Sequence, residues 1–275
     1  MKSIKIPSKI ELAAFDLDGT LVGENNDLYP GVKEAIDALQ KRGASVLLAS
    51  GREAFSMQRF ANILRLNDAL ISLNGAVIVD ASGNIQHRTS IEQTHMQAIL
   101  EVLREMPTFT FVFTAEQLLA SADTQELHMF KQYSHAEIKV CDTYLSFMEN
   151  NAVEKLLFVA DHDRLIRFRE AVFKRVPQGL NADFSTSTFL EIYNANISKG
   201  AALEWICKQR GISSEHVIAA GDGENDVTMI QFAGLGIAMG TAPEHVKSVA
   251  DYVTEKQEEG GLVKVLSEIM ENRTE

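Results

Sequence analysis

The sequence is poor in cysteine: its 275 residues include only Cys141 and Cys207, which are far apart and form no CxxC pair. We therefore expect no disulfide framework and a reducing, cytoplasmic location. Basic residues are also scarce, because 26 lysines and arginines face 38 aspartates and glutamates, giving a net charge of −12. Phosphate backbones are bound by basic surfaces, so this balance argues against nucleic acid as a partner.

Long apolar runs are missing as well. No stretch approaches the ~18 residues of a membrane-spanning helix, so we expect no association with a membrane. Residues 1–9 contain lysines but no apolar segment of the kind found in signal peptides. The remaining composition, 45% apolar and 23% charged, is that of an ordinary globular protein of one large or two ordinary domains. Its acidic charge means that a phosphorylated substrate would need local cations.

The first third of the chain alternates between apolar segments of strand length and amphipathic segments of helix length. Strands are expected at 12–15, 45–49, 69–72 and 77–80. Helices are expected at 31–42 and after Ser50-Gly51-Arg52 to about residue 64. Pro30 and Gly43 are typical start and stop signals for the first helix. This alternation predicts parallel βαβ units.

From about residue 84 the pattern changes to that of an α+β domain. Helices are expected at 91–106 and 164–175, and strands at 109–114, 156–160 and 189–193. Phe109, Phe111 and Phe113 are spaced by two, which predicts a strand face that packs on the core of this domain.

The βα alternation returns in the last third. Strands are expected at 217–220, 235–239 and 252–254, and helices at 199–210, 227–232, 243–249 and 262–270. Ser198 is a suitable N-cap and Gly211 a suitable stop for the first of these helices. We therefore predict an α/β fold, in which a Rossmann-like parallel sheet core is built from residues 1–84 and 187–275. An α+β domain at residues 85–186 is inserted into it.

Two carboxylates, Asp16 and Asp18, come directly after the first apolar strand. Carboxylates at the edge of a core are costly unless they are compensated, and a bound divalent cation is a common compensation. Their spacing of two would project both to the same side of an extended chain, and Gly19 permits a sharp turn after them. An acidic turn without a ligand explains this stretch equally well when it is taken alone. An EF-hand loop does not, because Leu21 stands where its glycine should be.

Further polar residues gather at the expected carboxyl ends of parallel strands, where functional residues of such sheets lie. They are Ser50-Gly51-Arg52, Asn74, and Asp222 with Asn225 and Asp226, while Lys199 begins a helix. Each of these taken alone has an ordinary explanation, such as a turn, an exposed lysine or a glycine-rich acidic loop. Together they provide what phosphoryl transfer needs: a carboxylate nucleophile, ligands for Mg²⁺, an acid/base group and donors that hold the transferred oxygens.

The segments Asp16-Leu17-Asp18-Gly19-Thr20, Ser50, Lys199 and Gly221–Asp226, in this order, resemble the four motifs of the haloacid dehalogenase (HAD) superfamily. The inserted domain lies between the second and third motifs, as does the C2-type cap of the Cof-like, type IIB phosphatases. The phrases Asn74-Gly75-Ala76 and Ile197-Ser198-Lys199-Gly200 are also typical of that branch. The resemblance covers essentially the whole chain. It implies a HAD-like core with a cap domain that closes over the site and selects the substrate.

The resemblance also implies a role for each residue at the motif positions. Asp16 would be the nucleophile, and Asp18 the general acid and then the general base. Mg²⁺ would be held by Asp16, the backbone carbonyl of Asp18, Asp222 and, directly or through water, Asp226. Phosphate or substrate would be held by Ser50, Gly51, Lys199 and Asn225, with Asn74 and Arg52 at the mouth of the site. Ser50 departs mildly from the family, where threonine is at least as usual, but both carry a hydroxyl donor.

The expected function is therefore a Mg²⁺-dependent phosphatase that hydrolyses small phosphorylated metabolites, with sugar phosphates as the favoured class, through an aspartyl-phosphate. Two alternatives stay open: a phosphomutase, which also begins with an aspartyl-phosphate, and a non-catalytic metabolite-binding protein on the same scaffold. The sequence predicts neither the physiological substrate nor the oligomeric state. The histidines and arginines of the inserted domain carry no pattern that assigns them a role.

Overall fold

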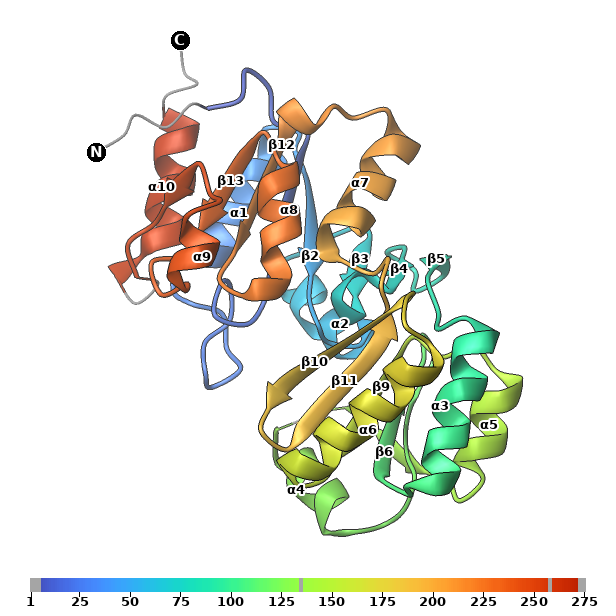
Figure 1. Cartoon of the computed structure of the whole chain (residues 1–275). Helices are drawn as coiled ribbons and strands as arrows, with labels where there is room; N and C mark the ends of the chain where they lie inside the picture. Colours follow the sequence, from blue (N-terminus) through green and yellow to red (C-terminus); the bar gives the residue numbers. More distant parts are fainter. Residues whose placement is uncertain (1–5, 134–135, 257–258, 272–275) are drawn as a thin grey trace. The chain divides into compact units, whose positions relative to one another are not determined.

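The computed structural model describes residues 6–133, 136–256 and 259–271. The chain divides into two compact units, shown in Figure 1: one comprises Met1–Gln86 with Ser198–Glu275, and the other His87–Ile197. An α/β core interrupted by an inserted α+β segment is thus confirmed. No helix within the described ranges is both long and apolar enough to cross a membrane.

The first unit is built on a sheet with the strand order β14-β13-β12-β1-β2-β3-β4-β5. Its strands are β1 (Leu12–Phe15), β2 (Ser45–Ala49), β3 (Leu70–Ser72), β4 (Val77–Val79), β5 (Ile85–Arg88), β12 (Val217–Gly221), β13 (Leu235–Ala238) and β14 (Tyr252–Val253). The pairs from β14 through to β3 are parallel, whereas β4 is antiparallel to β3. The βαβ pattern of the sequence therefore holds as far as β3, after which a tight turn reverses the chain.

Helices and short 3₁₀ turns join these strands. They are α1 (Val32–Lys41), α2 (Ala54–Ile63), η1 (Leu73–Gly75), α7 (Lys199–Arg210), η2 (Ser214–His216), η3 (Glu224–Asp226), α8 (Val227–Phe232), α9 (Glu244–Lys247) and α10 (Gly261–Glu271). On one face of the sheet, α7 and α8 pack through Leu203 and Met229 onto Leu12 and Leu47. Side chains alternate along a strand, so Ala13 and Phe15 of β1 face the opposite side and are also fully buried.

The second unit contains a sheet with the order β10-β11-β9-β6-β7-β8. Its strands are β6 (Phe109–Phe113), β7 (Leu118–Ala120), β8 (Ile138–Val140), β9 (Lys155–Val159), β10 (Leu180–Thr186) and β11 (Phe189–Asn194). Its helices are α3 (Gln93–Glu105), α4 (Gln125–Tyr133), α5 (Tyr144–Asn150) and α6 (His162–Arg175). The main core of this unit lies between the sheet and α3, α5 and α6.

The boundary of the inserted segment differs from the expected one. A division after residue 186 would separate β10 from β11, but these strands pair antiparallel from Leu180–Asn194 to Thr186–Phe189. Residues 187–197 therefore belong to the second unit. The sequence pattern did not predict β10, because most of its side chains are not buried and they show no apolar alternation.

The aromatic strand is found where the sequence predicts it, but its packing differs. Phe111 and Phe113 are buried, yet it is Val112 on the opposite face of β6 that joins the main core. Phe111 instead packs on Phe130 of α4, with ring centroids 4.3 Å apart. The sheet of this unit therefore buries apolar side chains on both faces.

Candidate active site

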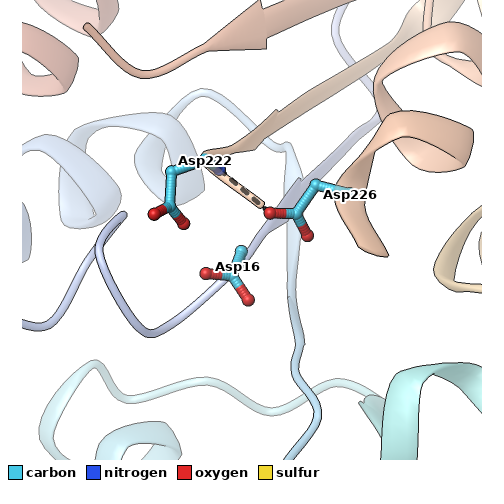
Figure 2. Close-up of side chains that lie close together, drawn as sticks. All are labelled: Asp16, Asp222 and Asp226. Carbon is cyan, nitrogen blue, oxygen red and sulfur yellow. Dashed lines mark hydrogen bonds between the residues drawn. The ribbon is translucent and has the colours of Figure 1, made fainter. Parts of the chain in front are cut away.

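Two neighbouring parallel strands bring the first and fourth motifs together. β1 pairs in register with β12, and the backbone N–H of Asp16 continues this pairing by donating to the carbonyl of Ala220 at 3.0 Å. The carboxylates of Asp16, Asp222 and Asp226 consequently face one another, as Figure 2 shows, and each offers an oxygen within 4.8 Å of the others. The structure thus places three of the expected metal-ligating side chains in one cluster.

The turn after β12 is fixed by Asp226. Its Oδ2 accepts the backbone N–H groups of Asp222 and Gly223, both at 2.9 Å. Its side chain lies directly over Gly221, where an added Cβ would come within 2.3 Å of the Asp226 carboxyl carbon. These contacts explain the glycine at position 221, because the side chain of Asp226 folds back over this part of the loop and leaves no room for a Cβ.

Gly19 has an equally specific role in the first turn. Its φ of +81° is a left-handed conformation that glycine adopts without strain, and an added Cβ would lie 2.3 Å from Oδ2 of Asp222. The turn after β1 therefore needs glycine for its backbone angle and also for the approach of the fourth-motif carboxylate. Thr20, which follows, donates a long hydrogen bond of 3.4 Å to Oδ1 of Asp222.

Lys199 is fully buried at the first turn of α7. Ser198 caps this helix as expected, its hydroxyl accepting the N–H of Ala201 at 3.0 Å. The lysine ammonium donates to Oδ1 of Asp16 at 2.5 Å and to Oδ1 of Asp226 at 2.6 Å. These two carboxylates explain why a cation is tolerated at the positive end of a helix.

Negative charge is in excess in this cluster, because three carboxylates surround one ammonium. The pKa of Asp16 is raised to about 8, chiefly by burial; the charge of Lys199 opposes the shift and that of Asp226 adds to it. Burial, followed by the charge of Asp226, also raises the pKa of Asp222 to about 6. Burial alone would lower the pKa of Lys199, but attraction by Asp16 and Asp226 outweighs it and the pKa is raised.

A divalent cation with oxygen ligands fits this donor set. The ligand oxygens are carboxylates, as Mg²⁺ prefers. A second cation would offset both causes of the raised aspartate pKa values, burial first and then the repulsion between carboxylates. Both oxygens of Asp226 already accept N–H donors, whereas Oδ2 of Asp16 accepts none within the described part of the chain.

Asp18 is held apart from this cluster by Arg52. The guanidinium donates to both carboxylate oxygens, at 2.9 and 2.5 Å, and a third bond of 2.8 Å joins it to Oδ1 of Asn26. It also lies over the ring of Phe60, 5.3 Å from the centroid. The side chain of Asp18 is about half exposed, so this carboxylate is accessible while its direction is set.

The second motif and the turn after β3 are linked through the backbone. Ser50 is completely buried, and its Oγ accepts the N–H of Arg52 at 3.2 Å. The N–H of Asn74 donates to the carbonyl of Ser50, and Oδ1 of Asn74 accepts Nδ2 of Asn225 at 2.9 Å. An added Cβ on Gly51 would lie 3.0 Å from Oδ1 of Asn74, so this glycine lets the turn after β3 approach. All ten expected site residues thus belong to the first unit, at strand ends or, for Lys199, at the start of α7.

No sequence pattern indicates two of these contacts, the hydrogen bond of Thr20 to Asp222 and that of Arg52 to Asn26. Asn26 has a φ of +60°, and asparagine is among the residues enriched in this left-handed region. A positive φ cannot be read from one asparagine in a loop, so no local signal could have identified this partner of Arg52.

The comparison with known proteins agrees with this geometry. A family model described as haloacid dehalogenase-like hydrolase matches residues 13–266. The chain is 28% identical to 5-amino-6-(5-phospho-D-ribitylamino)uracil phosphatase of Bacillus subtilis over 94% of each chain. It is 29% identical to HMP-PP phosphatase of Cronobacter sakazakii over 84% of each.

Solved structures show the same fold over nearly the whole chain. A haloacid dehalogenase-like hydrolase from Bacteroides thetaiotaomicron, 28% identical, has a TM-score of 0.85 and is matched over 95% of this chain and 100% of that one. A Thermotoga maritima protein, 26% identical, has a TM-score of 0.88 over 94% and 97%. The chain therefore belongs to the haloacid dehalogenase-like hydrolase family, and within it to the Cof-like phosphatases that its motifs resemble.

Proposed function

We propose that Asp16 is the nucleophile of this phosphatase. Attack of a carboxylate oxygen of Asp16 on phosphorus forms an aspartyl-phosphate while the bond from phosphorus to the leaving oxygen breaks. Lys199, bonded to Oδ1 of Asp16 at 2.5 Å, keeps this carboxylate oriented and favours its ionised form. Burial of Asp16 limits competing solvation of the nucleophile.

Asp16 and Asp222 would hold Mg²⁺ through their Oδ2 atoms, together with the backbone carbonyl of Asp18. When bound, the ion supplies positive charge that offsets the repulsion between carboxylate and phosphate. Asp226 contributes mainly by position, since its two oxygens hold Lys199 and the loop that carries Asp222. A contact of Asp226 with the ion would then run through water.

Asp18 would give its proton to the leaving alkoxide and later accept one from the water that attacks the aspartyl-phosphate. That second attack breaks the bond between phosphorus and Asp16 and releases inorganic phosphate. Both oxygens of Asp18 accept N–H donors of Arg52. For an oxygen of Asp18 to reach the leaving group, Arg52 would release at least one of them, and a substrate phosphate is a suitable alternative partner for its guanidinium.

The remaining donors are suited to the transferred phosphoryl group. The hydroxyl of Ser50 accepts the N–H of Arg52 and still has a proton to donate. Gly51 follows Ser50 and lies beside the side chain of Asn74, which accepts the amide of Asn225. This amide contact links the second motif with the fourth motif. We assign these residues to phosphate and substrate binding.

The substrate class is small phosphorylated metabolites, and sugar phosphates are the first to test. The two curated relatives named above are phosphatases of a phosphoribitylamino-uracil and of HMP-PP, so their substrates already differ from each other. We also propose that the enzyme acts in the cytoplasm, in accord with its two free cysteines.

The observation that carries this function is the buried contact of Lys199 with Asp16 beside Asp222 and Asp226. The test is release of inorganic phosphate from hexose and pentose phosphates, nucleotides, flavin mononucleotide and pyridoxal phosphate, with Mg²⁺ or EDTA. We expect Asp16→Asn to lower turnover by about 10⁴-fold or more while circular dichroism shows an unchanged fold.

The other outcomes separate the alternatives. Phosphate release that persists in Asp16→Asn would contradict the assigned nucleophile. An isomerised sugar phosphate without free phosphate would establish a mutase. Tight binding of a metabolite without turnover at saturating Mg²⁺ would indicate a binding protein.

A further inference from the structure

A cavity of about 460 Å³ lies in the first unit, at the edge of the sheet opposite to the catalytic carboxylates. Its walls come from the segment before β3, the end of β4 with the turn that follows, and the last turns of α7. β3 runs parallel to β2, and β2 to β1, so the amino end of β3 and the carboxyl end of β1 lie at opposite edges. Small-molecule sites measure roughly 300–1,000 Å³, so this cavity can hold a ligand the size of one or two rings.

The floor of the cavity is apolar. Ile78 and Ile206 are fully buried and Ala69 nearly so. Trp205 of α7 is partly buried and packs against the same cluster. Trp205 is the single tryptophan of the chain. A flat indole next to aliphatic side chains favours a planar ligand, because aromatic rings stack with an offset on such a surface.

The charged groups of the cavity are already paired with one another or with the backbone. Arg210 forms two hydrogen bonds with the carboxylate of Asp68, one of them 2.9 Å long. Asp80 accepts the N–H groups of Ser82 and Asn84, each at 2.9 Å, and also the amide of Gln86. Because two carboxylates stand against one engaged guanidinium, the cavity disfavours phosphate and other anions.

Uncharged hydrogen-bonding groups remain at the rim. Among the residues that the structure describes, the side-chain amides of Asn67 and Gln209 have no hydrogen-bond partner, although both line the cavity. Each amide can donate and accept, and therefore suits the mixed edge of a heterocycle. This combination of a stacking surface, free amides and no free cation selects against phosphorylated compounds.

We propose that this cavity binds an uncharged aromatic heterocycle that lacks phosphate, such as a nucleoside or a free base. The ring lies against Trp205, and its polar edge meets the amides of Gln209 and Asn67. The site is distinct from the catalytic centre in place and in charge preference. It involves the carboxyl end of α7, whereas Lys199 at the amino end of the same helix contacts Asp16.

The single tryptophan makes occupancy measurable. We would titrate the full chain with uracil, adenine, uridine and adenosine and with the 5′-phosphates of the two nucleosides, following fluorescence of Trp205 and, independently, heat by calorimetry. The Asp16→Asn background with EDTA prevents turnover. We expect saturable one-to-one binding of at least one uncharged compound, and binding of its 5′-phosphate at least about tenfold weaker.

Three variants locate the site. Gln209→Ala removes an exposed amide and should weaken binding about fivefold, as expected for one hydrogen bond. Ala81→Phe places a ring in the cavity from an exposed position and should abolish binding. Lys208→Ala, on the same helix but outside the cavity, should bind like the parent. No saturable binding by any uncharged compound would overturn the proposal. Equal binding of the 5′-phosphates, or full binding in both Gln209→Ala and Ala81→Phe, would also overturn it.

Discussion

Each of the two units buries a carboxylate among several donors, but the balance of charge around that carboxylate differs. In the second unit, Glu154 is fully buried and accepts Nε and Nη2 of Arg88, each at 3.2 Å, Oγ of Ser90 at 2.6 Å and the N–H of Ala115 at 2.7 Å. Each oxygen of Glu154 thus accepts two donors. In the first unit, Asp16 shares one ammonium with Asp226 and lies beside Asp222.

We infer that this difference separates a structural cluster, around Glu154, from the proposed catalytic cluster around Asp16. A buried carboxylate with a full set of hydrogen-bond donors, such as Glu154, holds structural elements together. Here it links the start of the inserted segment with the strands β6 and β9. A buried charge whose partners are too few keeps a raised pKa and can be satisfied by a ligand. The two clusters can therefore be tested against each other with single substitutions.

The largest effect is expected when the one cation of the catalytic cluster is removed. Lys199→Met leaves the carboxylates of Asp16 and Asp226 without an ammonium and should reduce kcat by about 10³-fold. We expect the melting temperature in EDTA to fall as well, because these carboxylates then repel one another or must take up protons. Steady-state kinetics and thermal denaturation check both results.

Lys208→Met provides the matched control on α7, since its side chain is 70% exposed and pairs only with Glu204 among the described residues. It should change neither kcat nor the melting temperature measurably. A kcat of Lys199→Met within tenfold of the parent value would mean that another residue supplies the cation that catalysis needs. That result would contradict the distinction drawn between the two clusters.

The structural cluster should respond in the opposite way. Glu154→Gln removes the charge that Arg88 and Ser90 hold, and should lower the free energy of unfolding by about 3 kcal/mol. Urea denaturation gives this value. Because Arg88 retains two bonds of 3.1 Å to Glu116, we expect the variant still to fold. Its dependence on Mg²⁺ should match that of the parent, and a changed Mg²⁺ requirement would contradict the division into structural and catalytic clusters.

The sequence predicted the catalytic cluster more completely than the structural one. Strands such as β1 and β12 are continuous apolar runs, and the polar residues after them are necessarily brought to one edge of a parallel sheet. Asp16 and Asp222 could therefore be placed together without knowledge of side-chain geometry, whereas Lys199, which begins a helix, was placed with them through the family resemblance. The clamp of Arg52 and Asn26 on Asp18 could not, because it depends on the path of two loops.

The second unit was predicted less well for a related physical reason. Helices α3 and α6 have clear apolar faces and were expected, whereas β7, β8, α4 and α5 are short elements without a periodic pattern. The surroundings of Glu154 depend on the antiparallel pairing of β6 with β9. The register of two strands that are distant in the sequence cannot be read from a single sequence.

The burial of the catalytic cluster, together with its excess of negative charge, also predicts a dependence on pH. In EDTA, folded Asp16 and Asp222 keep protons up to pKa values of about 8 and about 6, whereas their ordinary value is 3.8. The folded state then binds more protons than the unfolded state between these limits, so stability in EDTA falls as the pH rises from 4 toward 8.

Mg²⁺ must displace the same protons, so its apparent affinity should rise between pH 6 and 8, by at most about tenfold per pH unit. Calorimetric titration with Mg²⁺ at pH 6, 7 and 8 measures this slope. Asp16→Asn should flatten it, because one titrating ligand is gone. Equal affinity at pH 6 and pH 8 in the parent would contradict the charge balance inferred for the cluster.

The smallest effect is expected at Arg52, whose partner Asp18 is about half exposed and belongs to neither buried cluster. Its ion pair with the half-exposed Asp18 should contribute under about 1 kcal/mol to stability. A lysine cannot hold both carboxylate oxygens in parallel, so Arg52→Lys should lower kcat/KM for an alkyl phosphate about fivefold through a loosened Asp18. An aryl phosphate such as p-nitrophenyl phosphate should lose less, because its leaving group needs little help from an acid.

Arg59→Lys is the matched control for this last comparison. Arg59 lies over the same Phe60 ring, at 5.6 Å from the centroid, but pairs with the exposed Asp27. We expect it to leave both substrates unaffected. An equal loss of kcat/KM for both substrates in Arg52→Lys would mean that Arg52 acts on the phosphate alone. A larger loss for the alkyl phosphate would show that a surface ion pair of small energetic value still directs the acid of the reaction.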